Sequence, residues 1–199
     1  MITAVMPPQP DALPRQALQE RVASTILEAA AHVLAARGEQ ASMSDVAAAA
    51  GVARATVYRY FPNRQALLDE LADSAVRGAG DRLASARIDE IPVLDGISRA
   101  IRALVEVGDG FIVLAREHPH ADRERFERHV GGPIRALVER GQSSGDIRED
   151  IPSTWLTDSL IGIVVNVLSS PLQRGREDTV AAMTSVYIDG ARDRASAVA

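Results

Sequence analysis

The sequence predicts an all-α fold, and three observations support that prediction. Apolar residues make up 46% of the chain and aromatic residues only 4%, and the many alanines favour helices over strands. Apolar residues recur at helical spacing over several stretches. Prolines and glycines fall between these stretches, where they end one helix and precede the next. At 199 residues the chain can form one helical body, or one small domain plus a larger one.

The absence of cysteine excludes several kinds of site. Disulfides, thiolate zinc sites, iron–sulfur clusters and cysteine nucleophiles all require that residue. The first residues lack the cationic start and apolar core of a signal peptide, and no apolar run reaches the roughly 18 residues that a membrane span needs. We therefore expect a cytoplasmic protein without a membrane segment.

The first elements are an N-terminal arm and a long helix. Prolines at positions 7, 8, 10 and 14 predict that residues 1–15 form a flexible arm, because proline removes a backbone donor and fixes φ. A domain at residues 16–86 follows. Its first helix is expected from about Gln16 to Arg37, and Gly38 supplies the stop.

The next segment has the form of a helix-turn-helix motif, over about residues 43–62. Ser42–Asp45 matches a capping box, in which the serine hydroxyl and the aspartate carboxylate cap backbone amides of a short helix. Gly51 can adopt the positive φ of a tight turn, and a second short helix is expected over about Arg54–Tyr60. Asn63 then caps a longer helix.

Charge is distributed unevenly around this motif. The net charge is −5, yet no acidic residue lies between Asp45 and Asp69, an interval that contains Arg54, Arg59 and Arg64. A helix of this kind fits the major groove of DNA, which is about 12 Å wide. The stretch alone also fits an ordinary amphipathic surface helix with solvated charges. The net acidity opposes a non-specific DNA-binding protein, which we would expect to be basic.

Several short sequence motifs follow one another along this region. They are ILEAA from Ile26, MSDVA from Met43, AGV from Ala50 and TVYRYFPNR from Thr56, with Gly38 between the first two. Together they resemble the DNA-binding domain of the TetR family, without gaps over about residues 20 to 80. The resemblance implies a bacterial transcriptional regulator with an N-terminal three-helix helix-turn-helix DNA-binding domain. A long helix would link it to a C-terminal helical ligand-binding and dimerisation domain.

The resemblance also implies which side chains position the protein on DNA. It assigns phosphate contacts to the helix start at Ser42 and Met43, and to Tyr58, Tyr60 and Arg64. Helix N-termini attract anions, and phenol and guanidinium groups hydrogen-bond phosphate oxygens, so each assignment agrees with the chemistry of the residue. Core packing is the alternative for Tyr60.

Base reading is expected from the second short helix of the motif. Arg54 and Arg59 can bind guanine bidentately. The methyl groups of Ala55 and Thr56 can contact the methyl group of thymine. A phosphate contact is the alternative for Arg59. The sequence departs from the family at Ala53, where a small hydroxyl residue often caps this helix, so the cap is absent or supplied differently.

Residues 87–199 are expected to form the C-terminal regulatory and dimerisation domain. Its helices are expected at about Val93–Glu117, Asp122–Gly141, Pro152–Ser170 and Glu177–Arg194. Apolar stripes on the last two can pair with a twofold mate as a four-helix bundle, which predicts a homodimer. A purely intramolecular core is the alternative. The stripe residues are Leu156, Leu160, Val164, Val167, Leu168, Val180, Met183, Tyr187 and Ala191.

An effector pocket is predicted within this domain, where an apolar lining can accept a small organic molecule. The candidate lining residues are Phe111, Leu114, Ile134, Leu137, Trp155 and Leu160. Core packing is the alternative for each of them. Asn166 lies in an apolar run, where its amide can orient a ligand or hydrogen-bond across the dimer.

Signals of catalysis and metal binding are weak. His118, His120 and Asp122, with His129 nearby, can ligate a metal, but a solvated cluster at a helix junction is the alternative. The sequence contains no metalloprotease helix, nucleophile elbow, P-loop or dinucleotide fingerprint. We therefore expect neither an enzyme nor a cofactor. The sequence instead predicts a sequence-specific DNA-binding regulator, a repressor that a small organic effector releases from a palindromic operator.

Overall fold

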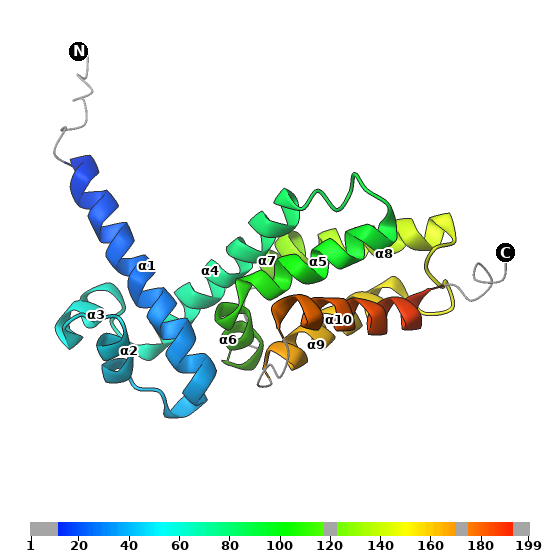
Figure 1. Cartoon of the computed structure of the whole chain (residues 1–199). Coiled ribbons are helices and arrows are strands. Elements are labelled where there is room, and N and C mark those ends of the chain that lie inside the picture. The colour runs from blue at the N-terminus through cyan, green and yellow to red at the C-terminus, as the bar shows by residue number, and fades with distance from the viewer. Residues whose placement is uncertain (1–11, 118–122, 170–174, 193–199) are drawn as a thin grey trace, which may run out of the picture. The chain divides into compact units, whose positions relative to one another are not determined.

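The computed structural model describes residues 12–117, 123–169 and 175–192, and every regular element in these ranges is a helix (Figure 1). The predicted all-α fold is confirmed. The chain divides into two compact units, Met1–Leu67 and Leu68–Ala199, with the division inside one helix. No helix in the described ranges is long and apolar enough to cross a membrane.

The first unit contains the helices of the predicted motif. They are α1 (Ala12–Arg37), a 3-10 turn (Gly38–Gln40), α2 (Met43–Ala49), α3 (Arg54–Tyr60) and the start of α4 (Arg64–Ser85). α2 packs against both α1 and α3. The buried side chains recur at helical spacing and include Ile26, Ala30, Leu34, Val46, Val57 and Phe61. α3 has the bounds that the sequence predicts.

Two helix starts show how local sequence sets the boundaries. α1 begins at Ala12, earlier than predicted, so Pro14 lies in its first turn. Proline is tolerated there because the first amides of a helix have no intrahelical acceptor. α4 begins as predicted after Asn63, whose side-chain oxygen accepts a hydrogen bond from the Ala66 amide at 2.8 Å. Residues 1–11 of the predicted arm lie outside the described residues.

The second unit is a helical body built from the rest of α4 and the helices that follow. These are α5 (Val93–Val107), α6 (Asp109–Glu117), α7 (Arg123–Phe126), α8 (Gly132–Ser144), α9 (Ser153–Leu168) and α10 (Arg176–Ala191). A π-helical turn, Glu127–Gly131, joins α7 to α8. α5 is central to the body, because it packs against α8, α9 and α10 (Figure 1).

Two of the helices predicted for this unit are interrupted. The helix predicted at Val93–Glu117 breaks at Gly108, whose φ of +66° lies in the left-handed region that favours glycine. The helix predicted at Asp122–Gly141 contains the π turn, in which the Gly132 amide donates to the Glu127 carbonyl. Pro133 follows directly and has no amide proton to close an α-helical turn, which favours this wider one.

Candidate nucleic-acid interface

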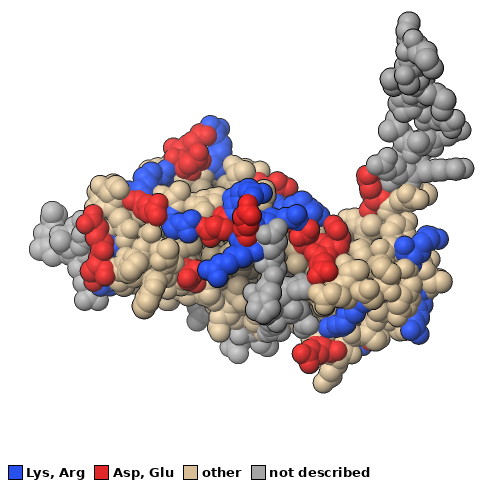
Figure 2. All heavy atoms as spheres, turned by 180° about the vertical axis from the view of Figure 1, so that it is seen from behind, with Lys and Arg blue, Asp and Glu red and all other residues tan. Residues whose placement is uncertain are grey.

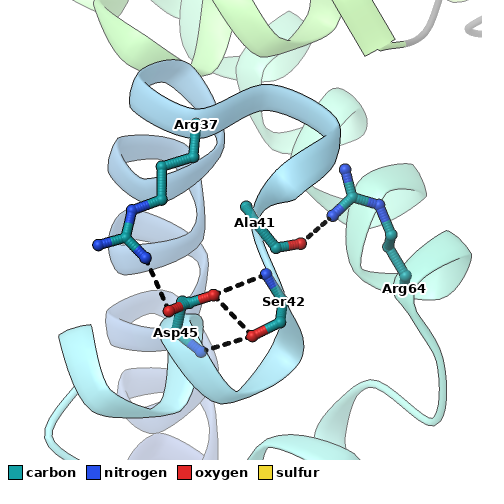
Figure 3. Close-up of polar contacts among 5 residues, drawn as sticks. All are labelled: Arg37, Ala41, Ser42, Asp45 and Arg64. Atoms are coloured by element: carbon teal, nitrogen blue, oxygen red, sulfur yellow. Dashed lines mark hydrogen bonds and ion pairs between the residues drawn. The ribbon is translucent and has the colours of Figure 1, made fainter.

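The start of α2 is held by the predicted capping box (Figure 3). The Asp45 amide donates to the Ser42 hydroxyl oxygen at 3.2 Å, and the Asp45 carboxylate accepts from the Ser42 amide at 2.9 Å and from its hydroxyl at 2.6 Å. Arg37 donates to the same carboxylate at 2.7 Å. The hydrogen bonds from Ser42, and then the Arg37 charge, hold the pKa of Asp45 below its ordinary value.

Arg64 reaches back from α4 to the turn that precedes α2 (Figure 3). Its Nη1 donates to the carbonyl oxygen of Ala41 at 2.5 Å, and its Nη2 lies 3.4 Å from the carbonyl oxygen of Gly38. The side chain is half-buried at this position. The sequence predicts a phosphate contact for Arg64, whereas its contacts in the structure fix the segment that leads into Ser42.

The outer face of α3 carries the side chains predicted to read DNA. Val57 and Phe61 anchor the helix on its inner face, with 0% and 5% of their surfaces exposed. On the other side, the exposed residues are Arg54, Ala55, Tyr58 and Arg59, and the half-buried ones are Thr56 and Tyr60. One short helix therefore combines an apolar anchor with a polar, cationic surface.

Two arginines of α3 lie over tyrosine rings. The guanidinium carbon of Arg54 is 5.3 Å from the centre of the Tyr58 ring, and its Nη2 donates to the Tyr58 hydroxyl at 3.2 Å. Arg59 lies 5.2 Å from the centre of the Tyr60 ring. These cation–π contacts favour particular side-chain positions before any ligand is bound. The Tyr60 ring also packs 6.5 Å from that of Phe61, so it contributes in part to the core.

The start of α3 lacks a side-chain cap. Ala53 occupies the N-cap position with an extended backbone, φ −67° and ψ 144°, and makes no side-chain hydrogen bond. The Thr56 amide donates to the Ala53 carbonyl at 2.8 Å, so the helix is nevertheless continuous from Arg54. The departure noted at Ala53 thus leaves the first amides of α3 without a side-chain acceptor.

Comparison with known proteins agrees with this geometry. The family model described as bacterial regulatory proteins of the tetR family matches residues 26–71, which include α2 and α3. The transcriptional repressor LfrR of Mycolicibacterium smegmatis is 43% identical over 89 residues, 44% of each chain. The uncharacterised regulator YvdT of Bacillus subtilis is 26% identical over 151 residues, 71% of this chain and 77% of YvdT. The chain belongs to the TetR family.

Solved structures of TetR-family regulators share the fold over most of the chain. LfrR of Mycobacterium smegmatis, in complex with proflavine, aligns with a TM-score of 0.72 at 25% identity, over 87% of this chain and 97% of LfrR. AibR, in complex with isovaleryl coenzyme A and operator DNA, aligns with a TM-score of 0.67 at 20% identity, over 83% and 97% of the two chains. This TetR-family protein is a DNA-binding transcriptional regulator. Its relatives are regulators and not enzymes.

Outside α3, charges of both signs are mixed on this TetR-family regulator. Figure 2 shows arginines and acidic residues interspersed over one face of the molecule. Some form ion pairs, such as Arg125 of α7 with Asp73 of α4, and Arg77 with Glu70 at 2.9 Å within α4. Exposed pairs of this kind contribute about 0–1 kcal/mol each. The opposite charges of these pairs neutralise one another locally. The arginines of α3, in contrast, lie in an interval of the sequence that contains no acidic residue.

A cavity of about 650 Å³ lies in the second unit, between the C-terminal half of α4 on one side and the π turn with α8 on the other. This volume is within the usual range for small-molecule sites, roughly 300–1,000 Å³. Its larger apolar lining residues are Leu83, Ile88, Pro133 and Leu137, and its charged or ionisable ones are Asp89, Arg128, His129 and Arg140. Among the predicted lining residues whose side chains the structure describes, Leu137 is the one that borders this cavity.

The other residues predicted to line a pocket lie elsewhere. Phe111, Ile134 and Leu160 are at most 1% exposed and belong to the central core of the second unit, which corresponds to the core-packing alternative. Trp155 is 70% exposed and therefore does not line an internal pocket of the single chain. Asn166 is exposed as well. The side chain of Leu114 lies outside the described residues.

The stripes predicted to face a twofold mate are mostly buried within the single chain. Residues of the central core are Leu156, Leu160 and Val164 of α9 and Val180, Met183, Tyr187 and Ala191 of α10. The Tyr187 hydroxyl donates to the Leu156 carbonyl at 3.1 Å, and burial raises the pKa of this phenol. For these residues the intramolecular alternative is correct. The exposed faces of the two helices carry other residues, among them Trp155, Gly162, Ala182 and Val186.

Most of the histidine cluster identified in the sequence lies outside the residues that the structure describes. His118, His120 and Asp122 lie outside the described residues. Within the described ranges, no group of three histidine, aspartate or glutamate side chains could hold a metal ion. His129 lies in the π turn, at the wall of the cavity.

Proposed function

We propose that this protein is a homodimeric repressor that binds a palindromic operator through α3 and is released by a small organic effector. The outer face of α3 is the observation that supports DNA reading best. Arg54 and Arg59 are exposed on a helix that is anchored by the buried Val57. This helix lies in the acid-free interval of an otherwise acidic chain. A duplex would therefore meet cationic side chains there without local repulsion from carboxylates.

The proposed roles divide the motif between base reading and positioning. Base edges in the major groove are read by Arg54, Ala55, Thr56 and Arg59, and phosphates are contacted by Ser42, Met43, Tyr58 and Tyr60. For Arg64 the geometry supports a positioning role, because its guanidinium donates to the turn before α2. The motif would then meet the phosphates as a preformed surface.

A homodimer would place two copies of α3 on one operator. The exposed faces of α9 and α10 support this assembly, because Trp155 is 70% exposed and Val186 is 66% exposed. Large apolar side chains at the surface commonly mark protein interfaces. A twofold dimer would present two copies of α3 about 34–36 Å apart, or a multiple of that distance, and would read an inverted repeat.

The proposed release mechanism uses α4, which belongs to both units. Arg64 in its first turn contacts the turn before α2, and Leu83 near its end lines the cavity. An effector that prefers one position of α4 would change the operator-bound population. A shift from 99:1 to 1:99 requires about 5.5 kcal/mol of differential binding. LfrR in complex with proflavine shows that a relative of this fold accepts a small organic molecule.

Selection of bound sequences from random duplex DNA by the full chain tests the proposal. We expect enrichment of an inverted repeat. Arg54→Ala should weaken binding by about 1–3 kcal/mol and relax one base position in each half-site. Arg21→Ala, which removes an exposed arginine of α1, is the matched control and should leave the enriched sequence unchanged. Equal recovery of all sequences, with no enrichment, would instead indicate a non-specific DNA-binding protein.

A further inference from the structure

The cavity between α4 and α8 has the shape of a site for an amphipathic molecule. Leu83 and Ile88 supply one apolar wall, and Pro133 and Leu137 supply the opposite one. An apolar body can be buried between these walls, while polar groups at the rim fix its orientation. The chemistry of the rim therefore decides which class of molecule fits.

The rim carries an excess of basic groups. Arg128, His129 and Arg140 border the cavity, and among the described residues Asp89 is the one acidic residue that does so. Arg140 donates to the backbone carbonyls of Ile88, Asp89 and Ile91, so its charge is fixed beside the cavity. This fixed positive charge would repel a cationic ligand and attract an anionic one.

Arg128 and His129 are placed to contact such an anion. Arg128 pairs with Glu124, but 62% of the Arg128 side chain and 81% of the Glu124 side chain are exposed, so this pair is weak and can be exchanged for a ligand carboxylate. Within the described part of the chain, the His129 side chain makes no hydrogen bond or ion pair and is exposed. Both side chains come from the π turn, which adds one residue to the helix at the cavity wall.

The π turn also lies directly against α4. A Cβ atom added to Gly80 would be 3.1 Å from the Cβ of His129, so the two backbones approach closely at the edge of the cavity. A molecule bound against His129 would therefore press on the same stretch of α4. Through this contact, binding at the rim would act on α4, the helix that begins at Arg64.

We propose that this cavity binds an organic anion, a carboxylate on an apolar body, with Arg128 and His129 contacting the carboxylate and Arg140 contributing fixed charge. Organic cations of the same shape are disfavoured. That this anion acts as the effector rests on the proposed repressor function, whereas the ligand class rests on the cavity alone.

Isothermal titration of the full chain with matched probes tests the ligand class. The probes are 2-naphthoate against 2-naphthylmethylammonium, and octanoate against octylammonium. We expect each carboxylate to bind at least tenfold more tightly than its ammonium partner. Arg128→Gln should weaken carboxylate binding about tenfold or more. Arg123→Gln makes the same charge change at an exposed position outside the cavity lining and should leave binding unchanged.

Three results would overturn the proposal: equal binding of carboxylate and ammonium, an equal loss in both arginine variants, or no carboxylate binding below about 1 mM. The effector role has a separate readout, the release of selected operator DNA by a carboxylate that binds. Carboxylate binding without release would keep the site and reject the effector role. A chain that binds carboxylate but selects no DNA sequence would reject the proposed function alone.

Discussion

Arg64→Ala tests most directly how the DNA-reading motif is held. The variant loses the 2.5 Å hydrogen bond to the Ala41 carbonyl and the 3.4 Å contact with Gly38. The first is a half-buried bond from a charged donor, worth about 1.5–3 kcal/mol, whereas the second is too long to add much. For a protein of this size, each kcal/mol lowers the melting temperature by about 2–4 °C. We expect a fall of about 3–12 °C, measured by circular dichroism.

Arg64→Lys separates positioning from a direct phosphate contact. Lysine keeps the charge and can still reach a phosphate, but its ammonium is a compact point charge and does not reproduce the planar guanidinium fork. We expect Arg64→Lys to lose part of the same stability, and both variants to weaken operator binding with little change in its salt dependence. The measurement is operator affinity at several salt concentrations, combined with the melting temperatures.

The opposite pattern would refute the positioning role. A salt-dependence slope that falls by about 0.9 in Arg64→Ala, together with an unchanged melting temperature, would show that the guanidinium neutralises one phosphate. Full recovery of stability and affinity in Arg64→Lys would lead to the same conclusion, because charge alone would then be sufficient.

Three further predictions concern other parts of the structure. The hydrogen bonds of the capping box lower the pKa of Asp45 from 3.8. The ionised carboxylate therefore contributes its full stability above pH 3.8, and this contribution is lost as the pH falls through the folded pKa. The melting-temperature advantage of the native chain over Asp45→Asn should shrink in acid. Gly141→Ala should destabilise by about 1–3 kcal/mol in denaturant titration, because the new Cβ would lie 2.5 Å from Ile147; a neutral result would contradict the packing. Val186→Asp should leave the fold intact but shift sedimentation toward the monomer, and an unchanged dimer would exclude this face.

The DNA-binding motif could be predicted almost completely because its structure is set locally. Ser42 and Asp45 cap a helix through bonds only three residues apart. Gly51 is at the turn with φ +66°, as its position between the two short helices predicts. Arg64 is different, because its contacts with Gly38 and Ala41 span more than twenty residues and no spacing rule indicates them. Its charge was visible in the sequence, but its partner was not.

For the second unit, the sequence predicts the helices but not what covers each of their faces. Apolar periodicity identifies which face of α9 or α10 is buried, yet it is identical whether a neighbouring helix or a second copy of the chain covers that face. The residues predicted for the dimer are covered by their own chain, so a dimer on these helices must use the opposite faces, where Trp155 and Val186 are exposed. The same holds for the cavity, because the sequence does not show which elements pack around it. Gly131, Gly132 and Pro133 could have indicated an irregular helix, but only packing shows that this irregular turn lies against α4.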